Sequence, residues 1–215
     1  SAGNESAAVT VDTVPLSVNY STEDLSPVSD SSVSSLIKLE GDSITFEGTG
    51  ATVNGSAVTI TAAGAYSVSG TLKDGQIVVN TEDEATVTLV LNGANITNSV
   101  SAPIYVKSAD KVVVTLADGT QNILTDGASY IFESTETDEP NAAIFSNDDL
   151  TINGSGALTV NANYNNGIAT DDDLKITSGV ITVNAVNDGI KGKNYIAVKD
   201  GTITVNAGGD GLQSN

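Results

Sequence analysis

The stretch GIATDDDLKITSGVITVNAVNDGIKGKNYIAVKDGTITVNAGGDGLQSN, residues 167–215, determines the expected fold. Its glycines recur every 22 residues, and an Asn or Asp stands before each of them, giving Asn166–Gly167, Asp188–Gly189 and Asp210–Gly211. Each 22-residue block carries two short segments in which every second residue is Leu, Ile or Val, the pattern of a β-strand. A fixed repeat of about 20 to 50 residues predicts a solenoid, in which similar units stack along one axis.

The same repeat can be followed backwards from this stretch. Three apolar positions recur in every block: Ile144, Ile168, Ile190 and Leu212; Leu150, Leu174 and Ile196; Leu158, Ile181 and Ile203. Ile77 and Ile104 are expected to head two earlier, longer coils. Strands are expected at 43–46, 57–61, 65–69, 77–79, 87–91, 104–106 and 112–116.

The predicted fold is an all-β, right-handed parallel β-helix with three short strands per coil. Each coil would lie about 4.8 Å above the previous one. One coil cannot fold alone, because its inward side chains contribute on the order of 10 to 20 kcal/mol, whereas ordering its backbone costs at least about 20 kcal/mol. The coils therefore come stacked.

The domain organisation follows from the repeat. Residues 1–35 are rich in Ser, Asp and Glu and are expected to be a linker or a poorly ordered terminus, with a short strand near 14–18 and a helical turn near 32–37. Residues 36–215 form the β-helix domain, with irregular coils to about 141 and regular coils over 142–215. An excursion loop is expected over 125–141. The last coil begins at Gly211, so further coils are expected beyond Asn215.

Composition excludes several classes of function. The chain has no Cys, His, Met or Trp, and its 8 basic and 27 acidic residues give a net charge of −19. Such a charge disfavours nucleic acid and anionic membranes as partners, and the missing residue types exclude disulfides and His-based catalytic or zinc sites. Small polar residues, Thr and Val suggest an extracellular bacterial protein, either secreted or attached to the cell surface. The oligomeric state is left open.

Acidic and amide side chains recur at the corners of the predicted coils. Residues one coil apart stack in columns. One column holds Asn166, Asp188 and Asp210, next to Asn187, and a second holds Asp148, Asp172 and Asn194, next to Asp171. Stacked carboxylates about 5 Å apart repel unless a cation lies between them, and a hard cation with six to eight oxygen ligands describes Ca²⁺. The alternative is that these residues only cap their own turns.

Two resemblances to known families rest on these motifs. The pattern DDLKITSGVITVNAVNDGIKGKNYIAVKDGTITVNAGGDGL, residues 172–212, resembles the bacterial carbohydrate-binding domain-containing β-helix proteins. That resemblance implies a secreted protein associated with calcium and with cellulose or acidic plant polysaccharides. More distantly, NDGIKG, residues 187–192, resembles pectate-lyase-type β-helix enzymes, which implies Lys191 as the base and a calcium ion held by Asp. The lyase pattern expects an acid in the position of Lys191 one coil earlier, where this chain has Ala169.

We therefore expect a non-catalytic, calcium-dependent binder of plant-cell-wall polysaccharide, either cellulose or polygalacturonate-type sugars. Lys191, Lys193 and Lys199 would contact sugar carboxylates, and Tyr164 and Tyr195 could stack on pyranose rings. Two alternatives are a calcium-dependent pectate lyase with Lys191 as its base and a structural stalk or adhesin module.

Overall fold

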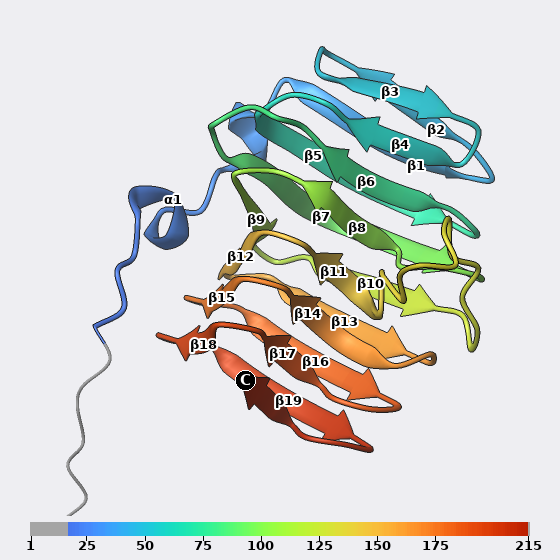
Figure 1. The fold of residues 1–215 in the computed structure, drawn as a ribbon. Coiled ribbons are helices and arrows are strands. Elements are labelled where there is room, and N and C mark those ends of the chain that lie inside the picture. The colour runs from blue at the N-terminus through green and yellow to red at the C-terminus, as the bar shows by residue number, and fades with distance from the viewer. Residues whose placement is uncertain (1–16, 215) are drawn as a thin grey trace, which may run out of the picture.

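The computed structural model describes residues 17–214 (Figure 1). This part of the chain is almost entirely β-structure, apart from the four-residue helix α1 (Thr22–Leu25) and the 3-10 helix η1 (Asp30–Ser32). Neither of these helices is long or apolar enough to cross a membrane. The strands form one sheet of 12 and one of 8, in which neighbours are mostly parallel and come from successive passes of the chain.

The 8-stranded sheet makes the first stack. It contains, in chain order, β3 (Ala51–Asn54), β4 (Ala57–Ile60), β6 (Gln76–Asn80), β8 (Ile104–Ser108), β11 (Ala142–Ser146), β14 (Asn166–Thr170), β17 (Ile190–Gly192) and β20 (Leu212–Ser214). All of its pairs are parallel except β3 with β4. A parallel neighbour requires the chain to return to the same edge, so each pair implies one turn of a solenoid.

The 12-stranded sheet makes two further stacks joined at one end. One stack runs through β9 (Lys111–Leu116), β12 (Asp149–Gly154), β15 (Asp173–Ile176) and β18 (Tyr195–Val198). The other runs through β10 (Gln121–Asp126), β13 (Ala157–Ala162), β16 (Val180–Ala185) and β19 (Thr202–Ala207). The remaining strands of this sheet are β1 (Ser35–Gly41), β2 (Ile44–Glu47), β5 (Gly64–Leu72) and β7 (Val87–Asn98).

A single long strand connects these two stacks. The first half of β7 pairs with β9 and its second half pairs with β10. Between the halves lies Gly93, whose φ of 74° is in the left-handed region that favours glycine. The strand therefore turns a corner without leaving the sheet, and the two stacks separate into two faces below it (Figure 1).

The register confirms the predicted columns. Strand pairing aligns one isoleucine from each successive coil, and all of these isoleucines are fully buried: Ile77, Ile104, Ile144, Ile168 and Ile190. The second and third predicted columns are also aligned as expected. Each of these buried side chains contributes about 1.5 to 3 kcal/mol relative to an exposed one. The interior is thus built from rows of aliphatic side chains along the axis, which is a β-helix-like arrangement; its right-handed sense stays a prediction.

The structure differs from the sequence-based expectation at the amino-terminal end. The expected helical turn near 32–37 is wrong, because residues from Ser35 onward enter β1, which is held between β2 and β5. Strands β3 and β10 were not predicted, since β3 is mostly exposed and β10 is polar at its start. The strand expected near 14–18 lies largely outside the described residues, and Ser17 and Val18 are not in a strand.

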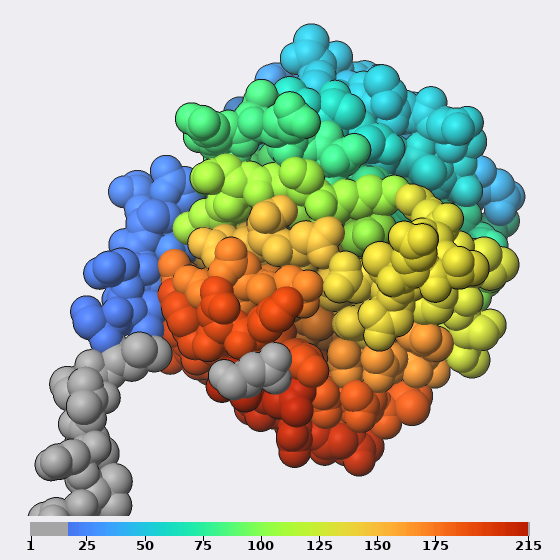
Figure 2. All heavy atoms as spheres, in the orientation of Figure 1, coloured from blue at the N-terminus to red at the C-terminus, as the bar shows by residue number. Residues whose placement is uncertain are grey.

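Two segments lie over the outside of the solenoid (Figure 2). Residues 17–34, here called the strap, run along the β9–β12–β15–β18 stack, although the sequence suggested a linker. Residues 127–141 form most of the excursion loop expected over 125–141, whose first two residues belong to β10. The loop lies beside the first stack, where Glu133 pairs with Lys107 of β8 at 2.6 Å and Tyr105 and Phe145 are tilted against each other at 5.9 Å. Phe145 is only 1% exposed. The strap and the loop therefore leave different faces open to solvent.

Candidate functional site

The outer face of the β9–β12–β15–β18 stack carries a group of charged side chains. Because side chains alternate along a strand, Leu150 and Ile152 point into the core, and Asp149, Thr151 and Asn153 point outward. Strand pairing puts outward residues of neighbouring coils side by side. One column runs Lys111, Asp149, Asp173 and Tyr195; the next runs Val113, Thr151, Lys175 and Ala197.

Three carboxylates meet where this face turns into the preceding corner. One oxygen atom from each of Asp149, Asp172 and Asp173 lies within 4.8 Å of the others, the only such acidic group among residues 17–214. The backbone N–H of Asp173 donates to Asp149 Oδ1 at 3.2 Å, and the Asn194 side-chain amide donates to Asp172 Oδ1. We call these three residues the carboxylate cluster. It is half-buried and faces outward beside Tyr195.

The electrostatics of this cluster favour a positive partner. Burial raises the pKa of Asp149, and the neighbouring carboxylates of Asp173 and Asp172 raise it further against a backbone hydrogen bond that lowers it. The pKa of Asp172 is raised for the same reasons, by burial first and then by Asp173 and Asp148. Burial and a hydrogen bond to Asp173 also raise the pKa of Tyr195. Raised carboxyl pKa values mean that the charged forms lack compensation, which a bound cation would supply.

In the first predicted corner column, side-chain oxygens accept hydrogen bonds from the backbone of the next coil. Asn166 Oδ1 accepts hydrogen bonds from Asn187 Nδ2 at 3.1 Å and from the backbone N–H of Asp188 at 3.2 Å. One coil further, Asp188 Oδ1 accepts the N–H of Asp210 at 3.0 Å. Asn166 and Asp188 are buried. The sequence predicted the stacking of these residues correctly, and several of the oxygens proposed as metal ligands here already accept N–H groups.

Of the second predicted column, only Asp172 belongs to the carboxylate cluster. Asp148 Oδ2 accepts the N–H of Ala109 at 2.9 Å. Asp171 forms an ion pair with Lys193 at 3.5 Å, and burial, followed by Asp171, raises the pKa of Glu139 in the excursion loop. Sequence reasoning missed Asp149 and Asp173, which start strands and not turns. Their outward position follows from alternation with Leu150 and Leu174.

The predicted sugar-contacting lysines are spread over different faces. Lys191 stands in the first stack, next to Ala169 and Gln213, and no ion pair to it occurs within residues 17–214. Lys193 is at the corner beside the cluster. Lys199 lies with its Nζ 5.3 Å from the ring centroid of Tyr20 in the strap. The column of Lys191 contains Phe145 and Ala169 in the preceding coils, as the sequence indicated, and no carboxylate.

The two predicted stacking tyrosines also differ in their surroundings. Tyr164 stacks on Tyr130 of the excursion loop, with ring centroids 4.2 Å apart and an angle of 18° between the planes. One face of Tyr164 is therefore covered by the protein itself, and Phe132 packs at its edge, 6.2 Å away. Tyr195 is half-buried at the end of the acidic column. Of the two, Tyr195 is the one placed beside the carboxylate cluster.

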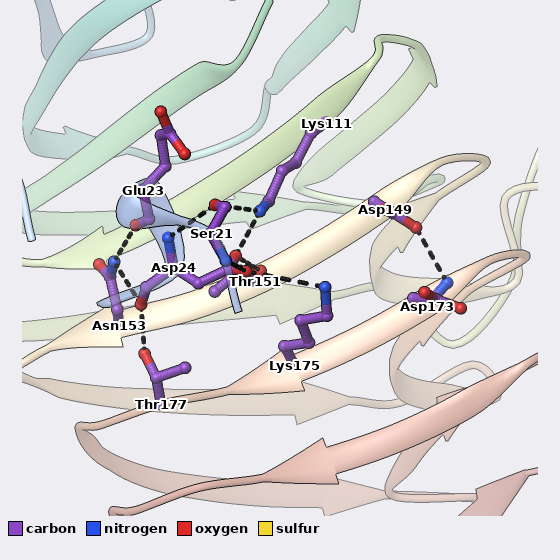
Figure 3. Close-up of polar contacts among 10 residues, drawn as sticks. All are labelled: Ser21, Glu23, Asp24, Lys111, Asp149, Thr151, Asn153, Asp173, Lys175 and Thr177. Carbon is purple, nitrogen blue, oxygen red and sulfur yellow. Dashed lines mark hydrogen bonds and ion pairs between the residues drawn. The ribbon is translucent and has the colours of Figure 1, made fainter. Parts of the chain in front are cut away.

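Sequence reasoning also missed a buried acid above this face (Figure 3). Asp24 of α1 is 0% exposed and forms ion pairs with Lys111 and, at 3.7 Å, with Lys175. Thr151 Oγ1 donates to its carboxylate at 2.6 Å. Burial alone would raise the pKa of Asp24, but the hydrogen bonds from Lys111 and Thr151 outweigh it, so the pKa is lowered. No sequence signal joins residues this far apart in the chain.

A solenoid that displays charged side chains in columns along its axis is a protein with an extended recognition surface. A family model described as Carbohydrate-binding domain-containing protein matches residues 54–215. The chain belongs to this family, which confirms the resemblance to it that the sequence motifs indicated. The matched residues include the repeat that builds the regular coils.

Two relatives carry the comparison further. A carbohydrate-binding domain-containing protein of Acetivibrio thermocellus is 52% identical over 161 residues, which are 74% of this chain and 56% of that protein. The chain thus spans little more than half the length of this relative. A solved structure described as the polysaccharide lyase-like protein from C. thermocellum, gadolinium derivative, is 49% identical and matches with a TM-score of 0.83, covering 85% of this chain and 74% of that one.

Proposed function

We propose that this protein binds acidic plant-cell-wall polysaccharide of the polygalacturonate type through a calcium ion held at the carboxylate cluster, without cleaving the sugar. The observation that carries the proposal is the convergence of Asp149, Asp172 and Asp173 on one outward-facing point. We also propose an extracellular location, because such a polymer is met outside the cell.

The cluster fits calcium by geometry and by chemistry. Ca²⁺ binds oxygen ligands at about 2.3 to 2.6 Å, so two ligands on opposite sides of one ion are about 4.6 to 5.2 Å apart. The oxygens of the cluster lie within 4.8 Å of one another. Asp149, Asp172 and Asp173 would hold the ion, and corner carbonyls or water would complete its shell.

An acidic polysaccharide suits this surface better than a neutral crystalline one. A cation at the cluster would neutralise a uronate carboxylate, and the protein's charge of −19 otherwise repels such a polymer. Lys193 stands beside the cluster and can meet a second carboxylate. Cellulose is bound by aligned exposed aromatic rings, whereas the ring of Tyr164 is stacked on Tyr130. Cellulose is therefore the weaker candidate among the two expected polymers.

A lyase needs a base beside the metal that neutralises the substrate carboxylate. Lys191 is in the first stack, in the column of Phe145 and Ala169, while the carboxylate cluster is on the second stack and its corner. The placement of Lys191 and the cluster on different stacks therefore favours binding of a uronate carboxylate over its cleavage.

The proposal is tested by cosedimentation with insoluble polygalacturonate in calcium and in a chelator. We expect binding in calcium, loss of binding in the chelator, and loss of binding in Asp172→Asn at equal calcium. Asp42→Asn is the matched control, because it removes the same charge from an 82% exposed carboxylate paired with Lys73 at the other end of the solenoid.

Binding that persists unchanged in the chelator and in Asp172→Asn would overturn the calcium-bridged mechanism. Absorbance near 235 nm, which detects the unsaturated product of a lyase, is recorded on the same samples. A signal that disappears in Lys191→Ala would replace the non-catalytic proposal with the lyase.

A further inference from the structure

One residue of the strap is buried against the solenoid. Among residues 17–34, Asp24 alone is buried, and Leu25 next to it is 46% exposed. The helix that carries Asp24 has only four residues, and isolated helices of that length are not stable in water. The strap therefore gains little from apolar burial, and its position depends on polar contacts made by Asp24 and its neighbours.

The receptor for Asp24 belongs entirely to the solenoid (Figure 3). Lys111, Thr151 and Lys175 surround the carboxylate, while Thr177 Oγ1 donates to the Asp24 carbonyl at 2.6 Å and Asn153 Nδ2 donates to the Glu23 carbonyl at 2.9 Å. These side chains come from three successive coils, on β9, β12 and the end of β15. Strand register fixes the backbone spacing of these side chains, and this register does not involve the strap.

The choice of residues identifies the chemistry that this receptor accepts. The chain has only eight lysines against 27 acids, yet two of them, each 11% exposed, converge on one carboxylate. Two ammonium groups and a hydroxyl donor form a receptor for a single anionic oxygen pair. The receptor also adjoins the carboxylate cluster, because Lys111 of β9 lies opposite Asp149 of β12 in the strand register.

We propose that Lys111, Lys175 and Thr151 form a carboxylate-binding subsite for a uronate unit of the polysaccharide, which Asp24 occupies as an internal ligand until the strap is displaced. This subsite rests on the proposed function and extends it. A bound polyuronate would place one carboxylate on the calcium ion at the cluster and the next on the two lysines. The strap then limits binding to chains able to compete with Asp24.

The contacts on either side of Asp24 are consistent with a displaceable strap. Beyond Asp24, the strap is tied by Asp30, whose carboxylate accepts from Asn92 Nδ2 at 2.7 Å and from Ser67. A groove of about 760 Å³ lies between Pro27–Ser31 and the turns of four successive coils. The strap thus spans an open groove and is pinned at two carboxylates, Asp24 and Asp30.

The first test asks whether the receptor binds a free carboxylate. Asp24→Ala removes the internal ligand and leaves space for formate, which is the missing group. We expect a lowered melting temperature in Asp24→Ala that formate restores in part, relative to chloride at equal ionic strength. The rescue should be absent in Asp24→Ala/Lys175→Met. Formate that stabilises no better than chloride would overturn the subsite.

The second test measures affinity for trigalacturonate in calcium by calorimetry. Apparent affinity falls by the fraction of molecules with an open site, so Asp24→Ala should bind about tenfold more tightly than wild type or better. Cellotriose, which lacks carboxylates, should show no such gain, and Lys175→Met should cancel it. If Asp24→Ala does not fold, Asp24→Asn, which removes the charge and keeps the side-chain shape, takes its place in this second test with the same expected gain.

Hydrogen exchange of the wild-type protein gives an independent measurement. Saturating trigalacturonate should increase exchange in residues 17–34, and protection that stays unchanged would contradict displacement of the strap. The outcomes separate the two proposals. If wild type binds trigalacturonate and Asp24→Ala gains nothing, the subsite is wrong and the proposed function stands. If formate rescues Asp24→Ala and neither form binds trigalacturonate, the proposed function is wrong and the carboxylate receptor stands.

Discussion

Asp188 Oδ1 accepts the backbone N–H of Asp210 at 3.0 Å, so that the corner side chain of one coil caps the backbone of the next. Asn166 makes the same contact with the N–H of Asp188 at 3.2 Å. An amide and a carboxylate perform this role equally well, because each presents an oxygen acceptor. The alternation of Asn and Asp in this column is therefore explained by capping alone.

Capping predicts how Asp188 responds to substitution. Asp188→Asn should leave the free energy of unfolding within about 0.5 kcal/mol of wild type, whereas Asp188→Ala should lower it by about 0.5 to 1.5 kcal/mol, because it removes the hydrogen bond to the Asp210 N–H. Urea denaturation measures both. If Asn is as damaging as Ala, the negative charge itself is required, and the corner column binds a cation as the sequence first suggested.

The glycines of the repeat are not equivalent, although they share one position. A Cβ at Gly189 would lie 2.2 Å from Val205 Cγ1 and 2.7 Å from the Gly211 carbonyl oxygen, while nothing lies within 4 Å of a Cβ at Gly211. Gly189→Ala should destabilise the protein by about 1 to 3 kcal/mol through overpacking. Gly211→Ala is the matched control and should be nearly neutral in thermal denaturation. Equal effects would contradict the packing described for this column.

Asp126 gives a pH dependence with a defined sign. Burial raises its pKa against the hydrogen bonds from Tyr130 and Asn163, which lower it. A raised pKa in the folded state favours folding below the unfolded value of about 3.9, and this contribution is lost as the pH rises through the folded pKa. The melting temperature of wild type should therefore fall relative to Asp126→Asn as the pH rises from about 4. A difference that is independent of pH would refute this.

Terbium luminescence tests the cation site directly, because the chain has no Trp and Tyr195 stands beside Asp173. Tb³⁺ should show tyrosine-sensitised emission that calcium displaces. Tyr195→Phe should weaken the emission while leaving displacement by calcium intact, and Asp173→Asn should weaken binding itself. Tyr66→Phe is the control, because Tyr66 belongs to β5 and is buried near Phe46. Emission that depends on Tyr66 and not on Tyr195 would place the ion elsewhere.

Much of the solenoid could be predicted from sequence because its information is local and repeated. The column of Ile144, Ile168 and Ile190 follows from one spacing, and strand register reproduces it. The hairpin of β3 and β4 did not follow, because β3 lies at the end of its sheet, belongs to no repeated coil and leaves Val53 exposed. Repetition thus predicts the interior, and it fails where a strand is held only by pairing at an edge.

The candidate site was harder to predict for a related reason. Asp172 was identified from its corner, but Asp149 and Asp173 begin strands whose outward direction depends on where each strand starts. The contact of Asp24 with Thr151 joins residues 127 positions apart. Nothing in a 22-residue period specifies such a contact, since the strap belongs to no coil.

The 22-residue spacing has a consequence for how such a chain can change in length. A second copy of residues 189–210 inserted before Gly211 would repeat every inward side chain, every strand partner and the cap between Asp188 and Asp210. An insertion of a single residue within a strand would turn the following side chains inside out. Duplication of a whole coil therefore preserves the packing and register of the solenoid. The proposed recognition surface can be lengthened in steps of one coil, both by evolution and by engineering.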